Sequence, residues 1–295
     1  MTHHTALLGD TPVHRIGYGA MQLAGPGVFG PPADPDAARA VLRRAVELGV
    51  DHIDTAQFYG PDVVNDLIRE ALHPYPEGLR LVTKVGAVRD AEGGWVPAGE
   101  PDQLVAQVEE NLRSLDVEQI HLVNLRRFEV DHPGSDEPAL AAQLEALAGL
   151  REQGKIGHVG VSSVTAETVA TAIETVGIGE VQNAYSILDR SDADVLDLCR
   201  QHGVAYVPYF PLGSAFTGGP RVLAADPHVS AAATKHGVTA SQVALAWLLA
   251  QYDGLLLIPG TSSVDHLEQN MAVLDLELDA DDLAALEKVE PAPVG

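Results

Sequence analysis

Short apolar runs alternate with amphipathic stretches along almost the whole chain. The runs have the length of buried strands, and the stretches between them repeat apolar residues with the period of a helix. Eight runs are predicted to be strands: Ile16–Gln22, Val50–Asp54, Leu79–Lys84, Gln119–Leu125, Ile156–Val161, Glu180–Ala184, Val204–Pro208 and Gly254–Ile258. A predicted helix follows each: Asp36–Leu48, Asp62–Leu72, Pro101–Ser114, Pro138–Gln153, Ala166–Val176, Asp192–His202, Ala240–Ala250 and Val264–Val273.

This alternation predicts an α/β fold, a (β/α)8 TIM barrel that spans residues 1–295 as a single domain. An N-terminal β-hairpin is expected through residues 6–15, turning at Gly9 and Asp10, and an extra C-terminal helix over Ala280–Val289. Two connections are longer than the rest, residues 86–100 and 209–230. Both follow strands, so both are expected on the rim where parallel barrels carry their active sites.

Three polar residues stand at or just past the ends of neighbouring strands. Asp54 ends one strand, Tyr59 lies in the loop after it, and Lys84 ends the next strand. Because neighbouring strand ends converge on one rim, we expect an acid, a phenol and an ammonium in one cleft. A lysine ammonium about 4 Å from the phenol supplies roughly the 4 kcal/mol needed to bring its pKa from about 10 to neutrality. The trio therefore predicts proton transfer from Tyr59 to a carbonyl oxygen, with Asp54 keeping Lys84 charged.

The composition narrows the range of partners. A net charge of −24 with only four lysines argues against nucleic acid and anionic membranes, since both bind basic surfaces. Cys199 is the only cysteine, which precludes an internal disulfide and fits a reducing, cytoplasmic compartment. No apolar stretch reaches transmembrane length, and the first residues lack the apolar core of a signal peptide. A cytoplasmic enzyme with a small-molecule substrate is expected.

The glycine-rich segment GPGVFG, residues 25–30, raises an alternative. It fits the dinucleotide-binding pattern G-x-G-x-x-G, in which the third glycine opens a helix. Here two prolines follow, and the helix is expected to begin only after Asp34 as its N-cap. We therefore favour a rim loop that carries Phe29 toward a substrate. The histidine spacings match no metal site, and GVSS at residues 160–163 is not a hydrolase nucleophile elbow, so neither metal nor serine catalysis is expected.

Several separated motifs together resemble the aldo-keto reductase family, in that family's order and over nearly the whole chain. They are GVDHIDTAQFYG, LRLVTKVG, GHVGVSS, EVQNAYS, VPYFPLG and IPGTSSVDHLEQN. The resemblance implies that Asp54, Tyr59 and Lys84 belong to a catalytic tetrad and that NADPH is the cofactor, with Tyr209 stacked on the nicotinamide. The implied cofactor-binding residues are Met21, Asp54, Ser162, Ser163, Gln182, Tyr209, Phe210, Leu212, Gly213, Gly260, Thr261, Ser262, Ser263, His266, Gln269 and Asn270.

The chain departs from the family pattern at two places. At the end of the fourth strand, where the tetrad usually has histidine, it carries Arg126. A guanidinium stays protonated and presents a planar fork of donors, so Arg126 is expected to polarise the carbonyl and to bind an anionic or phenolate oxygen beside it. In the phosphate-binding segment His266 stands where many members have arginine, and Gly260 where some have lysine. The NADPH preference therefore rests on the resemblance, and NADH is also possible.

The phrases GAMQLAGPGVFGPP, FYGPDVVNDLIREAL and NLR are similar to a bacterial subgroup that includes pyridoxal reductases. This implies an aldehyde or ketone substrate, with pyridoxal, an aromatic aldehyde flanked by a phenolic oxygen, as the leading candidate. The expected walls of the substrate pocket are Met21, Phe29, Trp95 and Phe128, and Arg126 is expected to orient the carbonyl. Two alternatives stay open: a nicotinamide-binding regulatory subunit without significant turnover, and a biosynthetic alcohol dehydrogenase of the same fold. A monomer or a small homo-oligomer is expected.

Overall fold

Seven strands form one parallel sheet in this computed structural model, which describes residues 4–130, 138–213 and 218–291. Each strand pairs in parallel with the next in the sheet. In sheet order they are β3 (Tyr18–Gly19), β4 (His52–Asp54), β5 (Arg80–Val85), β8 (Ile120–Arg126), β9 (Ile156–Ser162), β10 (Glu180–Gln182) and β11 (Ala205–Tyr206). Each of the seven overlaps one of the predicted strands.

The eighth predicted strand, Gly254–Ile258, is present only as two parallel bridges. Leu255 pairs with Tyr206 of β11, and Leu257 pairs with Ile16 just before β3. Leu257 also exchanges two backbone hydrogen bonds of 2.8 Å with the segment before β3. The segment thus joins the two outer strands of the sheet and closes the barrel, although it is too short for a continuous ladder.

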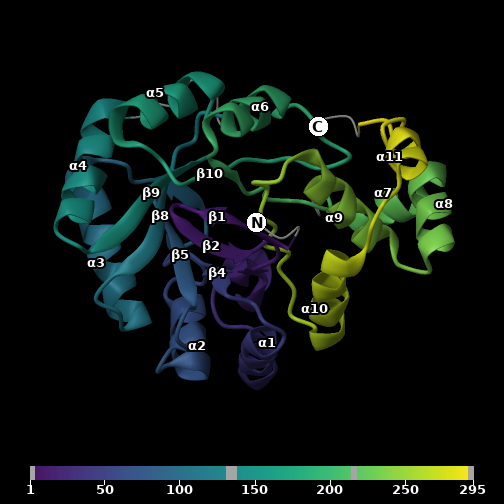
Figure 1. Cartoon of the computed structure of the whole chain (residues 1–295). Coiled ribbons are helices and arrows are strands. Elements are labelled where there is room, and N and C mark those ends of the chain that lie inside the picture. Colours follow the sequence, from purple (N-terminus) through teal and green to yellow (C-terminus); the bar gives the residue numbers. More distant parts are fainter. Residues whose placement is uncertain (1–3, 131–137, 214–217, 292–295) are drawn as a thin grey trace.

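Helices alternate with these strands as predicted. Around the sheet lie α1 (Pro35–Glu47), α2 (Val63–Leu72), α3 (Pro101–Leu115), α4 (Leu140–Glu152), α5 (Ala166–Val176), α6 (Ala193–His202), α9 (Ala240–Gln251) and α10 (Val264–Met271). The first six form an arc around the strands, and α9 and α10 lie on the remaining side (Figure 1). The fold is therefore the predicted α/β barrel.

The N-terminal hairpin closes one end of the barrel. As predicted, β1 (Thr5–Leu8) and β2 (Thr11–His14) are antiparallel and turn at Gly9 and Asp10. The hairpin crosses the centre of the ring in Figure 1, and its apolar side chains pack inside the barrel with Val82, Leu122 and Leu256. At its turn, Asp10 contacts the His158 ring near the start of β9 at 3.0 Å. The hairpin thus covers the amino-terminal ends of the strands and leaves the opposite rim for chemistry.

Both long connections contain structure that the sequence did not predict. Residues 86–100 hold an antiparallel pair, β6 (Ala87–Arg89) and β7 (Trp95–Pro97), each too short for an alternating pattern to be visible. Residues 209–230 lead into α7 (Gly219–Ala225) and α8 (Pro227–His236). Glycine and proline at the starts of these two helices concealed them, although proline is favoured in a first helical turn.

Several predicted elements are shorter in the structure, and three of them show how. The first strand was expected over Ile16–Gln22, but the chain leaves the sheet after Gly19 and forms the 3-10 helix η1 (Ala20–Leu23). The helix expected over Val264–Val273 ends at Met271 and continues as the 3-10 turn η4 (Ala272–Asp275). The C-terminal helix α11 starts as predicted at Ala280 but ends at Leu286.

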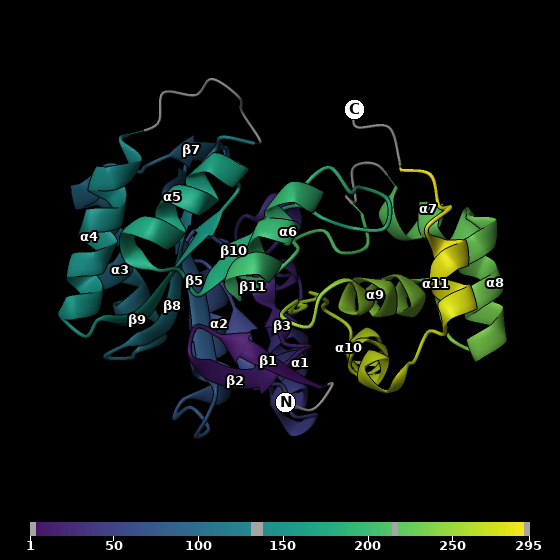
Figure 2. The same ribbon diagram turned by 45° about the horizontal axis from the view of Figure 1, so that its top comes forward.

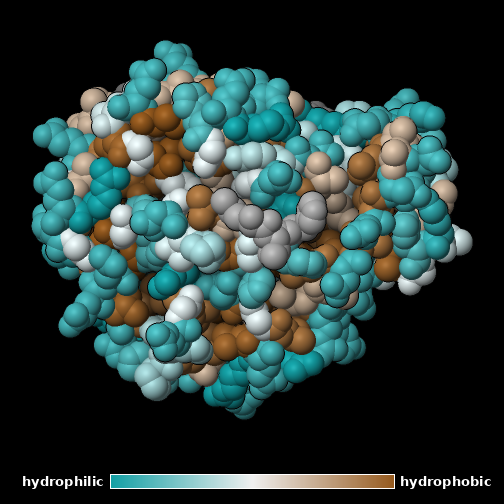
Figure 3. All heavy atoms as spheres, viewed as in Figure 1, coloured by the Kyte–Doolittle hydropathy of each residue, from teal (hydrophilic) through white to brown (hydrophobic). Residues whose placement is uncertain are grey.

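The helices α7, α8 and α11 gather on one side of the molecule, next to α9 and α10 (Figure 2). On the face that carries the hairpin, hydrophilic side chains predominate at the periphery and hydrophobic ones lie in patches between them (Figure 3). Within the described ranges, no helix is both long and apolar enough to cross a membrane.

Candidate active site

Asp54, Tyr59 and Lys84 meet at the open rim of the barrel. Asp54 is the last residue of β4 and Lys84 lies near the end of β5, so the two side chains approach each other from neighbouring strands. The Lys84 ammonium donates to Asp54 Oδ1 and, at 3.3 Å, to the Thr55 carbonyl oxygen. The same ammonium lies 5.3 Å from the centroid of the Tyr59 ring. All three side chains are buried, so the charges act on one another with little screening by water.

The electrostatics of this trio differ from the sequence expectation in one respect. Burial by itself would lower the pKa of Lys84, but the charges of Asp54 and Tyr59 raise it to about 12, so the ammonium is retained. Burial raises the pKa of Tyr59, and the opposing charges of Lys84 and Arg126 do not overcome that effect. We expected one lysine to suffice to lower the pKa of the phenol to near neutral pH. That expectation is wrong, because it omitted the desolvation of the phenolate.

A layer of polar side chains lies inside the barrel beside Asp54. Gln182, at the end of β10, donates from Nε2 to Asp54 Oδ2 at 2.8 Å and to Glu180 Oε1 at 2.5 Å. Asn124 of β8 donates to the same Glu180 oxygen at 2.9 Å. Neither Glu180 nor Asn124 was predicted to belong to the site. The available signal was a carboxylate and an amide within apolar strands, where such groups are rare unless they are paired.

Arg126 lies near Tyr59, among aromatic rings. Its guanidinium carbon is 5.6 Å from the Trp95 ring centroid and 5.1 Å from that of Phe128. The Trp95 ring is nearly perpendicular to the Tyr59 ring, with 6.5 Å between centroids. The connection 86–100 thus brings Trp95 to the rim as expected. Phe58, which was not predicted to be near the site, packs edge-on against both Tyr59 and Trp95 at 5.4 Å.

Gly86 allows this close arrangement. Its φ of 106° is open only to glycine without strain. A Cβ atom there would lie 2.2 Å from the carbonyl oxygen of Arg126. The turn from β5 into β6 therefore requires glycine for the backbone to pass beside Arg126.

Phe29 is held over the same rim by Arg89, a residue that the sequence analysis did not single out. The Arg89 guanidinium carbon lies 4.1 Å from the Trp95 ring centroid and 5.5 Å from that of Phe29. Its nitrogens donate to the carbonyl oxygens of Gly27, Val28 and Gly93 at 2.6–3.1 Å. As predicted, α1 begins at Pro35 with Asp34 as N-cap. The glycine-rich segment contains only the 3-10 turn η2 (Pro26–Val28), so it forms a rim loop and its last glycine does not open α1.

The expected nicotinamide-binding residues line the rim next to Gln182. Ser162 ends β9 and stands in register with Arg126 and Gln182. Among the described residues, Ser162 Oγ and Gln182 Oε1 are buried without a hydrogen-bond partner. A carboxamide offers both a donor and acceptors, so these two orphaned atoms fit the nicotinamide amide group. Ser163, with a φ of 57°, places its hydroxyl 3.2 Å from the Tyr209 hydroxyl.

The remaining expected cofactor-binding residues lie in two loops and one helix. Tyr209 pairs with Ala184, and the exposed Phe210 ring packs edge-on against Tyr209 at 5.2 Å. Gly213 N donates to Phe210 O at 2.8 Å, with Leu212 between them. Three more lie near β3. Met21 belongs to η1, Gly260 lies beside Gly19, and the carbonyl oxygen of Thr261 accepts a hydrogen bond from the Tyr18 hydroxyl at 2.6 Å.

The N-terminus of α10 carries the rest of this set. Ser263 is the N-cap and accepts from His266 N at 3.4 Å. Ser262, His266 and Gln269 are exposed, whereas Asn270 is buried and donates to Pro259 O at 3.4 Å. Unpaired N–H groups and the positive end of the helix dipole suit a phosphate at this position.

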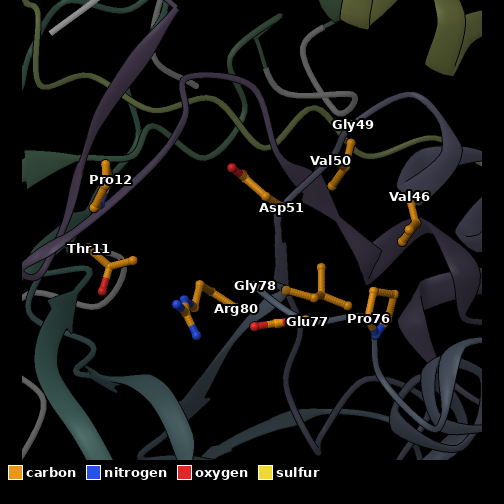
Figure 4. Close-up of a pocket in the computed structure, with 11 residues that line it drawn as sticks. Thr11, Pro12, Val46, Gly49, Val50, Asp51, Pro76, Glu77, Gly78 and Arg80 are labelled. Atoms are coloured by element: carbon orange, nitrogen blue, oxygen red, sulfur yellow. The ribbon is translucent and has the colours of Figure 1, made fainter.

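A hollow of about 480 Å³ lies at the end of the barrel opposite the rim. Figure 4 shows Asp51, Arg80 and Glu77 around it, together with Thr11 and Pro12 of the hairpin. None of the rim residues described above lines this hollow. We therefore place the chemistry at the rim, where the buried charges are, and assign no role to this hollow.

Comparison with known proteins agrees with this geometry. A sequence model of the aldo/keto reductase family matches residues 15–291. The chain is 47% identical to pyridoxine 4-dehydrogenase of Escherichia coli over 98% of this chain and 99% of that protein. It is 37% identical to an uncharacterised oxidoreductase of Schizosaccharomyces pombe over 96% of this chain.

Solved structures give the same result. The barrel superimposes with a TM-score of 0.80 on an aldo/keto reductase from Klebsiella pneumoniae in complex with NADP and acetate, at 25% identity over 98% of this chain and 96% of that one. The thermostable aldo-keto reductase Tm1743 superimposes with a TM-score of 0.79 at 28% identity. The chain therefore belongs to the aldo-keto reductase family and is an NADP-dependent oxidoreductase.

Proposed function

We propose that this aldo-keto reductase uses NADPH to reduce aromatic aldehydes that carry a phenolic or anionic oxygen beside the carbonyl, pyridoxal being the leading candidate. The observation that carries the proposal is that Tyr59 lies beside the Asp54–Lys84 pair and within the electrostatic influence of the Arg126 guanidinium. A proton donor close to two cations suits an oxygen that becomes negative during reaction. The similarity to a pyridoxine 4-dehydrogenase supports the same substrate class.

In the proposed mechanism Tyr59 is the general acid. NADPH supplies the hydride when it is bound. Tyr59 donates its proton to the carbonyl oxygen, and the buried ammonium of Lys84 stabilises the phenolate that remains. Asp54 keeps that ammonium charged and oriented, since it accepts from Lys84 through one oxygen and from Gln182 through the other.

The proposed cofactor contacts divide between two regions of the rim. Ser162 Oγ and Gln182 Oε1 would hold the nicotinamide carboxamide, and Tyr209 would stack on the ring. The N-terminus of α10, with Ser263 and His266, would face the adenosine phosphate, which the helix dipole stabilises. Histidine cannot offer a phosphate the bidentate donors of an arginine guanidinium, so the preference for NADPH over NADH is expected to be modest.

The proposed substrate pocket combines Trp95, Phe29 and Phe128 as walls with Arg126 as the polar anchor. A guanidinium presents donors in one plane and can bind a carbonyl and an adjacent phenolate oxygen together. Pyridoxal offers both oxygens, whereas benzaldehyde offers only the carbonyl. Discrimination between these two aldehydes therefore reports on Arg126.

The test is the steady-state kcat/KM for pyridoxal and benzaldehyde in the wild type, Arg126→His and Arg126→Lys. We expect the variants to lose roughly 10- to 100-fold for pyridoxal, the scale of one charge-assisted contact, and much less for benzaldehyde. An equal fall for both aldehydes would remove substrate recognition from Arg126. Consumption of NADPH on addition of an aldehyde separates the enzyme from a regulatory subunit, and initial rates with NADP⁺ and pyridoxine test the opposite direction of the same reaction.

A further inference from the structure

Glu180 is a carboxyl group buried in the barrel directly beneath the catalytic rim. The residue is 2% exposed. Among the described residues it forms no salt bridge, and its recorded partners are the neutral amides of Asn124 and Gln182. Burying a carboxyl without a directly bonded cation disfavours its charged form, and such groups are rarely buried. The catalytic steps assigned to Asp54, Lys84 and Tyr59 leave Glu180 without a role.

The strands are built to accommodate this group. Glu180 of β10 stands in register with Gly160 of β9, and Gly160 with Asn124 of β8. A Cβ atom on Gly160 would lie 2.1 Å from Asn124 Oδ1. The missing side chain on the middle strand therefore leaves the space through which Asn124 reaches Glu180 at 2.9 Å.

Glu180 is linked to the catalytic residues by one amide group. Gln182 Nε2 donates both to Glu180 Oε1 at 2.5 Å and to Asp54 Oδ2 at 2.8 Å, and Asp54 in turn accepts from Lys84. With both hydrogens of its amide nitrogen engaged, the Gln182 side chain can rotate little. Its Oε1 atom is then presented in a fixed direction at the rim.

We propose that Glu180 is a further positioning residue of this site, which orients Gln182 and carries a titratable charge beneath the catalytic rim. The inference rests on the proposed function in one respect, because it takes Gln182 to be a cofactor-binding residue. The charged groups facing Glu180 are Asp54 from β4 and Lys84 from β5, and the facing groups from β8 and β10 are uncharged amides. Burial, followed by the charge of Asp54, raises the pKa of Glu180 to about 7, so its charge changes near neutrality.

Ionisation of Glu180 has two consequences. A negative charge beneath the rim favours the cationic nicotinamide of NADP⁺ over the neutral ring of NADPH. The same charge disfavours the phenolate of Tyr59 and so weakens that residue as an acid. Removing the carboxyl charge while keeping its shape isolates both effects.

The decisive measurement is the ratio of the dissociation constants of NADPH and NADP⁺ from pH 6 to pH 8, obtained by quenching of protein fluorescence without any aldehyde. Both nucleotides carry the same 2′-phosphate, so its own ionisation cancels in the ratio. We expect the Kd of NADPH divided by the Kd of NADP⁺ to rise about threefold or more from pH 6 to pH 8 in the wild type. In Glu180→Gln this ratio should not change with pH. Asp192→Asn is the matched control: Asp192 is another buried carboxyl whose pKa is raised, mainly by burial, to about 7, but its partners are Tyr206 and Asn183. It should behave as the wild type.

Gly160→Ala provides a second variant. The added methyl group would drive Asn124 away from Glu180 and remove a hydrogen bond that favours the carboxylate. The midpoint of the pH dependence of the ratio should therefore move to higher pH. The proposal is overturned if Glu180→Gln and the wild type show the same pH dependence of the ratio, or if neither shows any. If the ratio titrates with Glu180 but no aldehyde is reduced, the inference about Glu180 stands and the proposed function fails.

Discussion

Asp54→Asn tests the buried ion pair on which the site depends. Asp54 offers two acceptor oxygens to two donors, one to the Lys84 ammonium and one to Gln182 Nε2. Asparagine has the same shape but only one acceptor, so its amide NH2 would face one of those donors. The Lys84 charge would also remain buried without a counter-ion. We expect the free energy of unfolding at pH 7 to fall by about 3–5 kcal/mol, the scale for breaking a buried pair.

The possible deprotonation of Lys84 sets an upper limit on this loss of unfolding free energy. The ordinary pKa of lysine is 10.5, so holding the amine neutral at pH 7 costs about 5 kcal/mol. This limit falls by about 1.4 kcal/mol for each pH unit above 7, since free lysine binds its proton less tightly there. In the variant, burial depresses the folded pKa of Lys84 below its unfolded value, so the unfolded state binds more protons and stability rises with pH. In the wild type the folded pKa of about 12 lies above the unfolded value, and the contribution of the pair is lost only as the pH passes from the unfolded toward the folded value.

The assay is urea unfolding of the wild type and Asp54→Asn between pH 7 and 9, where the difference should shrink as the pH rises. A loss of 3 kcal/mol corresponds to a midpoint shift of about 1 M or more. Glu109→Gln is the control, because Glu109 pairs with Lys155 at the exposed surface and should change stability by about 1 kcal/mol or less. A loss below about 1 kcal/mol for Asp54→Asn as well, or a difference independent of pH, would refute the reasoning.

Three further changes test other parts of the site. Tyr59→Phe should keep NADPH binding but lose roughly 10²-fold or more in turnover, the scale of a positioned general acid; near wild-type turnover would remove that role. His266→Arg should raise the ratio of NADPH to NADH affinity, measured by fluorescence titration, because a bidentate guanidinium suits a phosphate; an unchanged ratio would place the phosphate elsewhere. Gly86→Ala should destabilise by about 2 kcal/mol or more in thermal unfolding, since its Cβ would lie 2.2 Å from Arg126 O. Gly78→Ala, also at a positive φ but in open space, measures the strain alone, and equal losses for the two glycines would contradict the clash.

The sequence sufficed to predict the barrel and the meeting of Asp54, Tyr59 and Lys84, because a parallel barrel fixes where the strand ends go. It could not predict the contact between Glu180 and Asn124, which depends on the register of three strands and on the missing side chain of Gly160 between them. The two-strand unit around Trp95 was also hidden, since each strand is only three residues long. Such features arise from packing across the barrel and leave no local pattern.

The pKa of Tyr59 likewise depends on packing that the sequence does not reveal. From the sequence, the only visible influences on the phenol are charged neighbours, and Lys84 and Arg126 both favour its ionised form. The structure adds the burial of the ring, which opposes ionisation and outweighs them. The acid strength of Tyr59 is therefore set by how many charges the buried polar layer holds and by how far water is excluded from it. Glu180 shares that layer with Asp54 and Lys84, so the proposed role of its ionisation belongs to the same balance.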